Sequence, residues 1–320
     1  MRVHQTRLKA GIARTKEFER KRLASFSVNV GTKCGHGCLY CSTGAVLRMH
    51  RSFAQAGENP FAHGYAIVDP DTPERVARDA ERLTGRRLIQ LCTLVDAWAP
   101  EALEHNLGRR CLAAILSQPG WTVRVLTKNA AVVRDFDLIE QYRDRVLVGV
   151  SVTATPSMSG VMSILEPDAS GIQERMAALM EAKARGLRTY GMFCPLLPGI
   201  ADSPEQVDLL IQFAVGCNVE EIFVEPVNAR GPGLRLCETA LREHGHFTEA
   251  EAIGKVRERR QWSQYVRALI SNVQQSVERH FDLARLRVLL YPSRLLPEHA
   301  EDIRKHGAGV IWLGKDAPLR

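Results

Sequence analysis

The sequence predicts a mixed α/β fold: a partial (β/α)6 TIM-like barrel, open on one side, with a small C-terminal α/β appendage. Three observations favour this architecture. Short apolar strands alternate with helical segments along most of the chain, and this alternation implies right-handed crossovers and a parallel sheet. Six strand–helix units occur, which suits a partial barrel. After about residue 230 the alternation stops, so we expect residues 25–230 to form the barrel and residues 231–320 the appendage.

Composition limits the class of protein before any motif is considered. The 320 residues are 45% hydrophobic and 25% charged, as in a globular protein with a full core. No apolar run reaches the ~20 residues that cross a bilayer, and no secretory signal opens the chain. We therefore expect a cytoplasmic protein without a membrane partner, whose eight cysteines stay reduced.

The chain opens with a basic segment, residues 1–24, that shows little apolar periodicity. This segment suits either an arm that faces nucleic acid or a solvated lead-in. The whole chain carries a net charge of +7, which fits an acidic partner such as DNA or RNA, or simply arginine-rich faces that keep the protein in solution.

The predicted elements follow one another in a regular order. A helix begins near Pro73, since proline suits the first turn, and ends before Gly85. Residues 44–70 contain several turn-forming glycines and prolines, so we expect an irregular loop there. The predicted strands are 26–30, 87–92, 122–127, 145–152, 189–194 and 221–224, and the helices between them are 72–84, 101–117, 131–142, 171–185 and 203–215. In the appendage, we expect helices within 248–280, and strands 287–291 and 310–313 on either side of a short helix, 297–306.

Three cysteines, Cys34, Cys38 and Cys41, lie within eight residues on a glycine-bearing loop that follows the first strand. Three thiolates at this spacing can bind three corners of a cubic iron–sulfur cluster and leave the fourth iron open. An open metal position can bind a substrate or a cofactor. In barrels of this kind the loops at the carboxyl ends of the strands build the active site, and the cysteine loop lies at such an end.

This spacing, with Tyr40 directly before the last cysteine, resembles the radical S-adenosylmethionine (radical SAM) superfamily. The resemblance implies a 4Fe–4S cluster on Cys34, Cys38 and Cys41, and S-adenosylmethionine on the open iron. One electron, from a donor such as flavodoxin or ferredoxin, would then generate a 5′-deoxyadenosyl radical. A zinc knuckle is the alternative, with His36 or His50 as fourth ligand, although no second cysteine pair is present.

Further segments resemble one branch of that superfamily, spore photoproduct lyase and its relatives. The segments that carry this resemblance are 126–128, 149–153, 166–167, 195–200, 291–294 and 309–313. The resemblance implies that Thr93, Lys128 and Ser151 contact S-adenosylmethionine and that Tyr40 lies along its adenine. A lysine can pair with the cofactor's carboxylate, and hydroxyl groups can serve its ribose. The structural alternatives are core packing for Tyr40, a surface cation for Lys128 and turn positions for the two hydroxyl residues.

Cys92 is the candidate catalytic residue. In the lyase a cysteine opens a Cys-Thr-Ser-Asp run and returns a hydrogen atom to the product radical, whereas here the run from Cys92 to Asp96 contains one extra residue. Cys92 is therefore either a hydrogen donor or a small buried residue, and the latter is the commoner fate of a free cysteine. The other cysteines, Cys111, Cys194, Cys217 and Cys237, lack ligand spacing and are expected in the core.

The expected function is that of a radical SAM enzyme, resembling spore photoproduct lyase, that acts on nucleic acid in a reaction of the DNA-repair type. Two other classes stay open: a radical SAM enzyme for a small molecule or a peptide, and a non-catalytic module that binds metal or nucleic acid. Iron analysis separates the enzyme from the module. The effect of DNA or RNA on formation of deoxyadenosine separates the two kinds of enzyme.

Overall fold

The computed structural model describes residues 1–314, and residues 315–320, the end of the predicted appendage, lie outside this range. The contacts between residues divide the chain into two units. The first comprises Met1–Val150, Glu166–Ser170 and Glu174–Thr189. The second comprises Ser151–Leu165, Gly171–Gln173 and the chain from Tyr190 onward.

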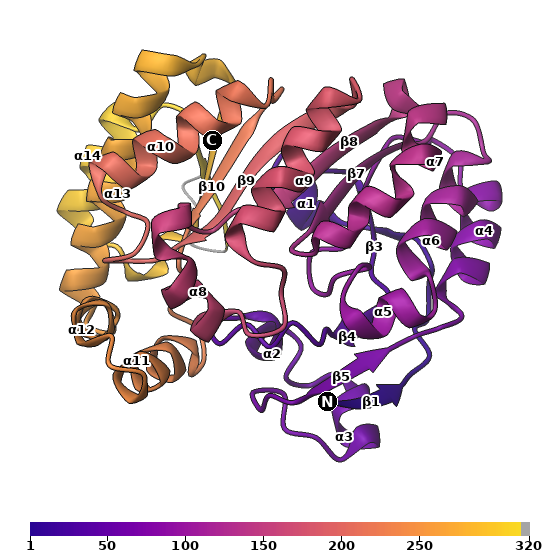
Figure 1. Ribbon diagram of the computed structural model, residues 1–320, viewed down its shortest axis with the longest axis horizontal. Helices are drawn as coiled ribbons and strands as arrows, with labels where there is room; N and C mark the ends of the chain where they lie inside the picture. Colours follow the sequence, from indigo (N-terminus) through magenta and orange to yellow (C-terminus); the bar gives the residue numbers. More distant parts are fainter. Residues whose placement is uncertain (315–320) are drawn as a thin grey trace. The chain divides into compact units, whose positions relative to one another are not determined.

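The first unit contains a parallel sheet with the strand order β3-β6-β7-β8. Its strands are β3 (Phe26–Val28), β6 (Leu88–Leu91), β7 (Thr122–Thr127) and β8 (Val146–Ser151). The short strand β2 (Ala13–Arg14) pairs antiparallel with β3 at the edge. Helices α4 (Thr72–Arg82), α6 (Leu107–Leu116) and α7 (Phe136–Gln141) lie along the outside of these strands (Figure 1). Every residue of β8 is buried, as expected for a strand covered on both faces.

The second unit contains four parallel strands in the order β12-β11-β10-β9. They are β9 (Arg188–Leu196), β10 (Ile222–Pro226), β11 (Leu286–Leu290) and β12 (Val310–Trp312). Strands β11 and β12 thus continue the sheet from β10 and do not form a separate small sheet. The helices of this part are α8 (Ser159–Leu165), α10 (Pro204–Gly216), α11 (Gly233–Glu243), α12 (Phe247–Lys255), α13 (Arg259–His280) and α14 (Pro297–His306), while α9 (Ile172–Ala184) lies mostly in the first unit.

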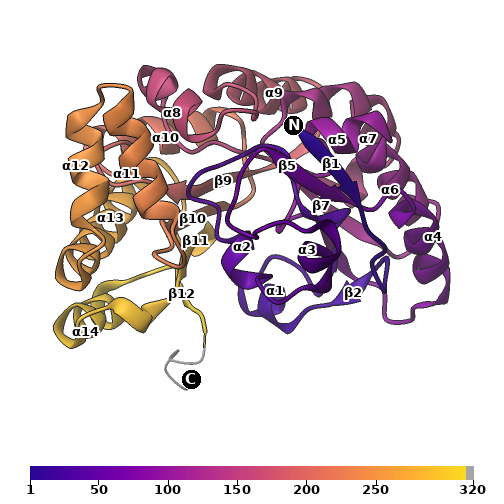
Figure 2. The same cartoon turned by 90° about the horizontal axis from the view of Figure 1, so that it is seen from below.

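A second, three-stranded sheet lies in the first unit with the order β1-β5-β4 (Figures 1 and 2). Strand β1 (Arg2–Gln5) pairs parallel with β5 (Tyr65–Val68), and β4 (Gly31–Lys33) pairs antiparallel with it. Phe53, Tyr65 and Ile67 form the small core of this region. The sequence predicted none of these pairings, because the three strands are short and far apart in the chain.

All six predicted strands are present, so the α/β class and the parallel arrangement are confirmed, whereas the partial barrel stays a prediction. Several local expectations were wrong. The segment 44–70 contains α2 (Thr43–Val46), α3 (Arg51–Ala56) and β5. The predicted helix 101–117 is two helices, α5 (Pro100–Glu104) and α6, because Asn106 adopts a left-handed conformation with φ +52°. Helix α1 (Lys16–Arg20) lies in the basic N-terminal segment, and α8 and α11 were missed.

Candidate functional site

The cysteine loop starts directly after β4, not after the first strand of the parallel sheet. Strand β3 ends at Val28 and the chain then enters β4, which pairs with β5. The backbone N–H of Cys41 donates to the carbonyl of Cys38 at 3.1 Å, which closes the loop as a turn. The next helix is linked to the carboxyl end of β6, because Thr43 Oγ1 donates to the Leu94 carbonyl at 2.8 Å. The small sheet therefore supports one side of the loop, and the parallel sheet supports the other.

Two glycines let the loop approach its surroundings closely. Gly37 has φ +66°, a conformation that favours glycine, and a Cβ there would lie 3.2 Å from Pro167 Cγ. A Cβ on Gly35 would lie 2.6 Å from Glu101 Oε2, and the Gly35 N–H donates to Glu101 Oε1 at 3.1 Å. Burial is the main reason why the pKa of Glu101 rises to about 7.

The three cysteines of the loop differ in exposure: Cys34 is half-buried, Cys38 is buried and Cys41 is exposed. Burial raises the pKa of Cys34 well above its usual value, and the neighbouring Cys41, Glu101 and Cys38 raise it further. Burial likewise raises the pKa of Cys38 to about 12, with contributions from Glu166 and Cys41. Without a cation the buried thiols of Cys34 and Cys38 therefore stay protonated, and a positively charged metal centre would be needed to stabilise their thiolates.

Within residues 1–314, no three histidine, cysteine or acidic side chains are grouped as ligands of one metal ion. A cubane cluster differs from such a site because each cysteine binds a different iron. The two histidines of the zinc alternative have other contacts. His36 Nδ1 lies 3.6 Å from Asp96 Oδ2, and His50 caps α3 through Ser52. Neither histidine is placed as a fourth ligand to the cysteines.

A buried carboxylate, Glu166, lies beside the loop and joins three functional side chains. It accepts a hydrogen bond from the hydroxyl of Tyr40 and forms an ion pair with Arg175. Lys128 Nζ lies 3.1 Å from Glu166 Oε1 and 5.7 Å from the centroid of the Tyr40 ring. Burial alone would raise the pKa of Glu166, but Lys128 and Arg175, together with the hydrogen bonds, lower it to about 2. The carboxylate is therefore ionised, and it fixes Tyr40 and Lys128 next to the cysteine loop.

Asp96 joins the ends of β6 and β7 to the same loop. Its carboxylate accepts hydrogen bonds from the Lys128 backbone N–H at 2.7 Å and from Thr127 Oγ1 at 2.9 Å, in addition to the His36 contact. Asp96 also accepts from the Trp98 N–H at 2.9 Å. Asp96, the end of the Cys92–Asp96 run, thus connects the ends of two strands.

Cys92, the candidate hydrogen donor, lies immediately after β6 in an unusual conformation. Its φ is +61°, which is costly for a residue with a Cβ and is often found at functional sites. The side chain is fully buried, and burial is the main reason why the pKa of the thiol rises well above its usual value. The thiol therefore keeps its hydrogen, as a hydrogen-atom donor must, and its role stays a prediction.

Some buried polar atoms have no hydrogen-bond partner within residues 1–314. They include His36 Nε2, which lies in the cysteine loop, Glu101 Oε2, whose other carboxylate oxygen accepts from the Gly35 N–H, and Thr93 Oγ1. Buried polar groups in native proteins are nearly always paired, so these atoms are available to a bound molecule or ion. Thr93 is one of the residues predicted to contact a cofactor.

The remaining predicted residue, Ser151, ends β8 and is assigned to the second unit. Its hydroxyl donates to the Cys194 carbonyl at 3.1 Å. Cys34, Cys38, Cys41, Tyr40, Cys92, Thr93 and Lys128 all belong to the first unit. Among the other cysteines, Cys111, Cys217 and Cys237 are buried, as expected for core residues, whereas Cys194 is only half-buried, so its core prediction was wrong.

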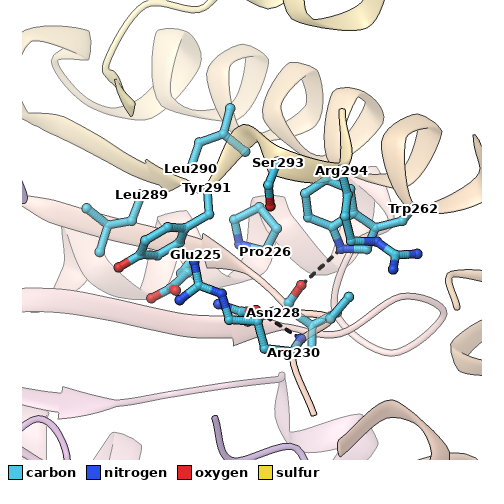
Figure 3. A pocket seen from close by; sticks show the side chains of 12 residues that line it. Glu225, Pro226, Asn228, Arg230, Trp262, Leu289, Leu290, Tyr291, Ser293 and Arg294 are labelled. Atoms are coloured by element: carbon cyan, nitrogen blue, oxygen red, sulfur yellow. Dashed lines mark hydrogen bonds between the residues drawn. The ribbon is translucent and has the colours of Figure 1, made fainter. Parts of the chain in front are cut away.

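The second unit has its own small pocket at the carboxyl ends of β10 and β11 (Figure 3). Glu225, Asn228, Arg230, Tyr291 and Arg294 supply polar groups to its lining. The Arg230 guanidinium lies 4.6 Å from the centroid of the Tyr291 ring, and the Arg230 backbone N–H donates to Asn228 Oδ1 at 3.0 Å. The lining thus contains two guanidinium groups, one carboxylate and two aromatic side chains, those of Tyr291 and Trp262.

The sequence did not assign roles to three of the residues that organise the first unit's site. Glu166 was noted only as part of a Glu-Pro pair, and Arg175 and Glu101 carried no signal. Arg175 lies in the first turn of α9, and its role in the site becomes visible only when its ion pair with Glu166 is known.

No family model matches the chain. An uncharacterised protein of Acidianus two-tailed virus is 23% identical over 224 residues, which cover 68% of this chain and 72% of that protein. An uncharacterised protein of Mycobacterium tuberculosis is 24% identical over 207 residues, or 64% of this chain and 59% of that protein.

The fold is similar to that of spore photoproduct lyase. The lyase in complex with dinucleoside spore photoproduct superposes with a TM-score of 0.57 at 13% identity, covering 89% of this chain and 81% of the lyase chain. A lyase variant with bound S-adenosylmethionine and dinucleoside spore photoproduct gives a TM-score of 0.56 over the same share of this chain. The chain therefore has the fold of the radical SAM protein spore photoproduct lyase.

Proposed function

We propose that this protein is a radical SAM enzyme that holds a 4Fe–4S cluster on Cys34, Cys38 and Cys41. The single observation that carries the proposal is that three cysteines share one short loop, in which His36 Nε2 is buried without a hydrogen-bond partner among residues 1–314. The residues present fit such a group, because three thiols at this spacing can bind three irons of a cubane cluster and the unpaired atom needs a polar partner. The similarity of the fold to the lyase supports the same reading.

When bound, the cluster and S-adenosylmethionine would supply a 5′-deoxyadenosyl radical that abstracts a hydrogen atom from the substrate. The chain's own residues bind, orient and shield these groups. Tyr40 would present its ring to the adenine, held by its bond to Glu166. Lys128 and Thr93 would bind the cofactor's polar groups, while the role of Ser151 stays a prediction. Cys92 would hold a hydrogen atom on its Sγ for return to the product.

We propose nucleic acid as the substrate class, with a one-electron donor such as flavodoxin or ferredoxin. The net charge of +7 and the pocket in the second unit support this. Arginine beside an aromatic ring suits a phosphate next to a base, and Arg230 lies over Tyr291. The lyase structures contain a dinucleoside lesion.

The test begins with anaerobic reconstitution and analysis of iron and sulfide. About four irons and four sulfides per chain are expected for a 4Fe–4S cluster. Cys38→Ala should abolish cluster formation, whereas Cys217→Ala, which truncates a buried cysteine elsewhere, should not. One zinc per chain, or a cluster that survives Cys38→Ala, would refute the proposal.

A second measurement tests the substrate class. Deoxyadenosine formation is compared with and without DNA, RNA, a peptide mixture and small molecules. Stimulation by nucleic acid that weakens steeply with added salt supports the proposal. Arg230→Gln should reduce that stimulation, while Arg235→Gln, the same change on an exposed position of α11, should not. Stimulation by peptides or small molecules alone would assign the enzyme to the other substrate class.

A further inference from the structure

Lys33, the residue before Cys34, has its ammonium group held in a defined cage. Nζ donates to the carbonyl of Pro60 at 3.0 Å and to that of Ala62 at 2.6 Å. It also lies 4.8 Å from the centroid of the Tyr65 ring, within the range of a cation–π interaction. Tyr65 is 1% exposed. A long and normally mobile side chain is thus fixed in one place.

The loop that supplies the two carbonyls is itself fixed. The hydroxyl of Tyr65 donates to the Asn59 carbonyl at 2.7 Å. A Cβ on Gly44, three residues after Cys41, would lie 2.5 Å from the Pro60 carbonyl oxygen, so the loop packs against the segment that follows the cysteines. The cage therefore holds its position relative to the cysteine loop.

The caged cation has no carboxylate partner within residues 1–314. The nearby carboxylate of Glu58 is bound instead by Arg2 at 3.0 Å and by His4 at 2.9 Å. The groups within electrostatic reach of Lys33 are Cys41 and Cys34 and, with a smaller effect, Glu58. A partly buried cation is costly unless a negative charge compensates it, and carbonyl dipoles and a ring compensate only in part. A cluster with thiolate ligands would supply that negative charge.

We propose that Lys33 is a positioning residue whose fixed positive charge makes the cluster easier to reduce. The inference rests on the proposed function, because it needs a cluster on the three cysteines. Reduction takes one electron from the external donor and adds one negative charge to the cluster. A nearby cation stabilises the reduced form more than the oxidised form, and net charge near the cluster is one determinant of its potential.

The experiment is a redox titration of the reconstituted protein, followed by electron paramagnetic resonance, for the wild type and three variants. Lys33→Met removes the charge and keeps much of the chain length. At a fixed potential, its ratio of reduced to oxidised cluster should fall at least tenfold, which is 59 mV for one electron. Lys33→Arg keeps the charge and should stay within about threefold of the wild type. Lys9→Met, the matched control at an exposed lysine, should leave the ratio unchanged.

Stability and iron content are measured on every variant before the titration. If Lys33→Met unfolds or loses iron, Lys33→Gln, which keeps N–H donors without the charge, takes its place in the comparison. An unchanged ratio in the uncharged variant would overturn the inference and leave Lys33 as a structural link to the 60–62 loop. If the wild type itself forms no cluster, the proposed function fails first, so the two failures are distinguishable.

Discussion

Replacing Glu166 by glutamine tests whether the buried ionic network holds the candidate site together. The carboxylate is 3% exposed, and its partner Arg175 is 1% exposed. Glu166→Gln keeps a similar shape and an oxygen for the hydroxyl of Tyr40, but it leaves the guanidinium of Arg175 buried without a counter-charge.

The size of the effect follows from two arguments that agree. Removing one partner of a buried ion pair typically costs about 3–5 kcal/mol. Independently, a pKa lowered from 4.5 to about 2 corresponds to roughly 3 kcal/mol in favour of the ionised form in the folded state. We therefore expect the free energy of unfolding to fall by about 3–4 kcal/mol.

The assay is urea unfolding of the apoprotein at neutral pH. The midpoints of the wild type and the variant are compared, provided that the dependence of the free energy of unfolding on urea concentration is the same in both. The control is Glu181→Gln, whose exposed pair with Arg185 should contribute less than about 1 kcal/mol. In the double variant Glu166→Gln/Arg175→Met the loss should be smaller than the sum of the single losses, because the guanidinium of Arg175 is then no longer left buried without its carboxylate. A loss below about 1 kcal/mol for Glu166→Gln would show that water already compensates Arg175, and the reasoning would be wrong.

Three further predictions follow from the same structure. Folding lowers the pKa of Glu166, so the ionised carboxylate contributes fully to the free energy of unfolding above about pH 4.5, and this contribution is lost as the pH falls toward 2. The difference in free energy of unfolding between the wild type and Glu166→Gln should therefore shrink over that range. A difference that grows on acidification would contradict the predicted direction. The indole N–H of the buried Trp98 donates to Asp135 Oδ2 at 2.8 Å, and Asp135→Ala removes this acceptor. Urea unfolding should therefore show that the free energy of unfolding falls by about 1–3 kcal/mol, whereas Asp135→Asn should reduce it less. Cys92→Ala in the reconstituted enzyme should leave formation of deoxyadenosine intact but change the products found by mass spectrometry; unchanged products would remove Cys92 from the mechanism.

The sequence was most informative where structure is local. Strand β7 was predicted at its observed bounds because Thr122–Thr127 is a run of β-branched and apolar residues. Helix α14 was likewise predicted at its bounds, with Pro297 at its first position. The break between α5 and α6 was missed, because the left-handed conformation of Asn106 is set by its surroundings.

Non-local relations could not be predicted. The three cysteines were visible because they share one loop. The bond between Tyr40 and Glu166 joins residues 126 positions apart, and only the fold brings them together. The pairing of β5 with β1 and β4 is of the same kind, since each strand has at most four residues and carries too weak a pattern to reveal its neighbours.

The place of β5 between β1 and β4 has a consequence for handling the protein. All four residues of β5 are buried, and β1 is what covers one of its edges. Proteolytic removal of Arg2–Gln5 would strip a largely exposed strand and uncover an apolar edge that can recruit another chain. Loss of Arg2–Gln5 would then loosen Tyr65 and the small sheet that precedes the cysteine loop. Preparations clipped at this end should therefore aggregate before the rest of the molecule unfolds.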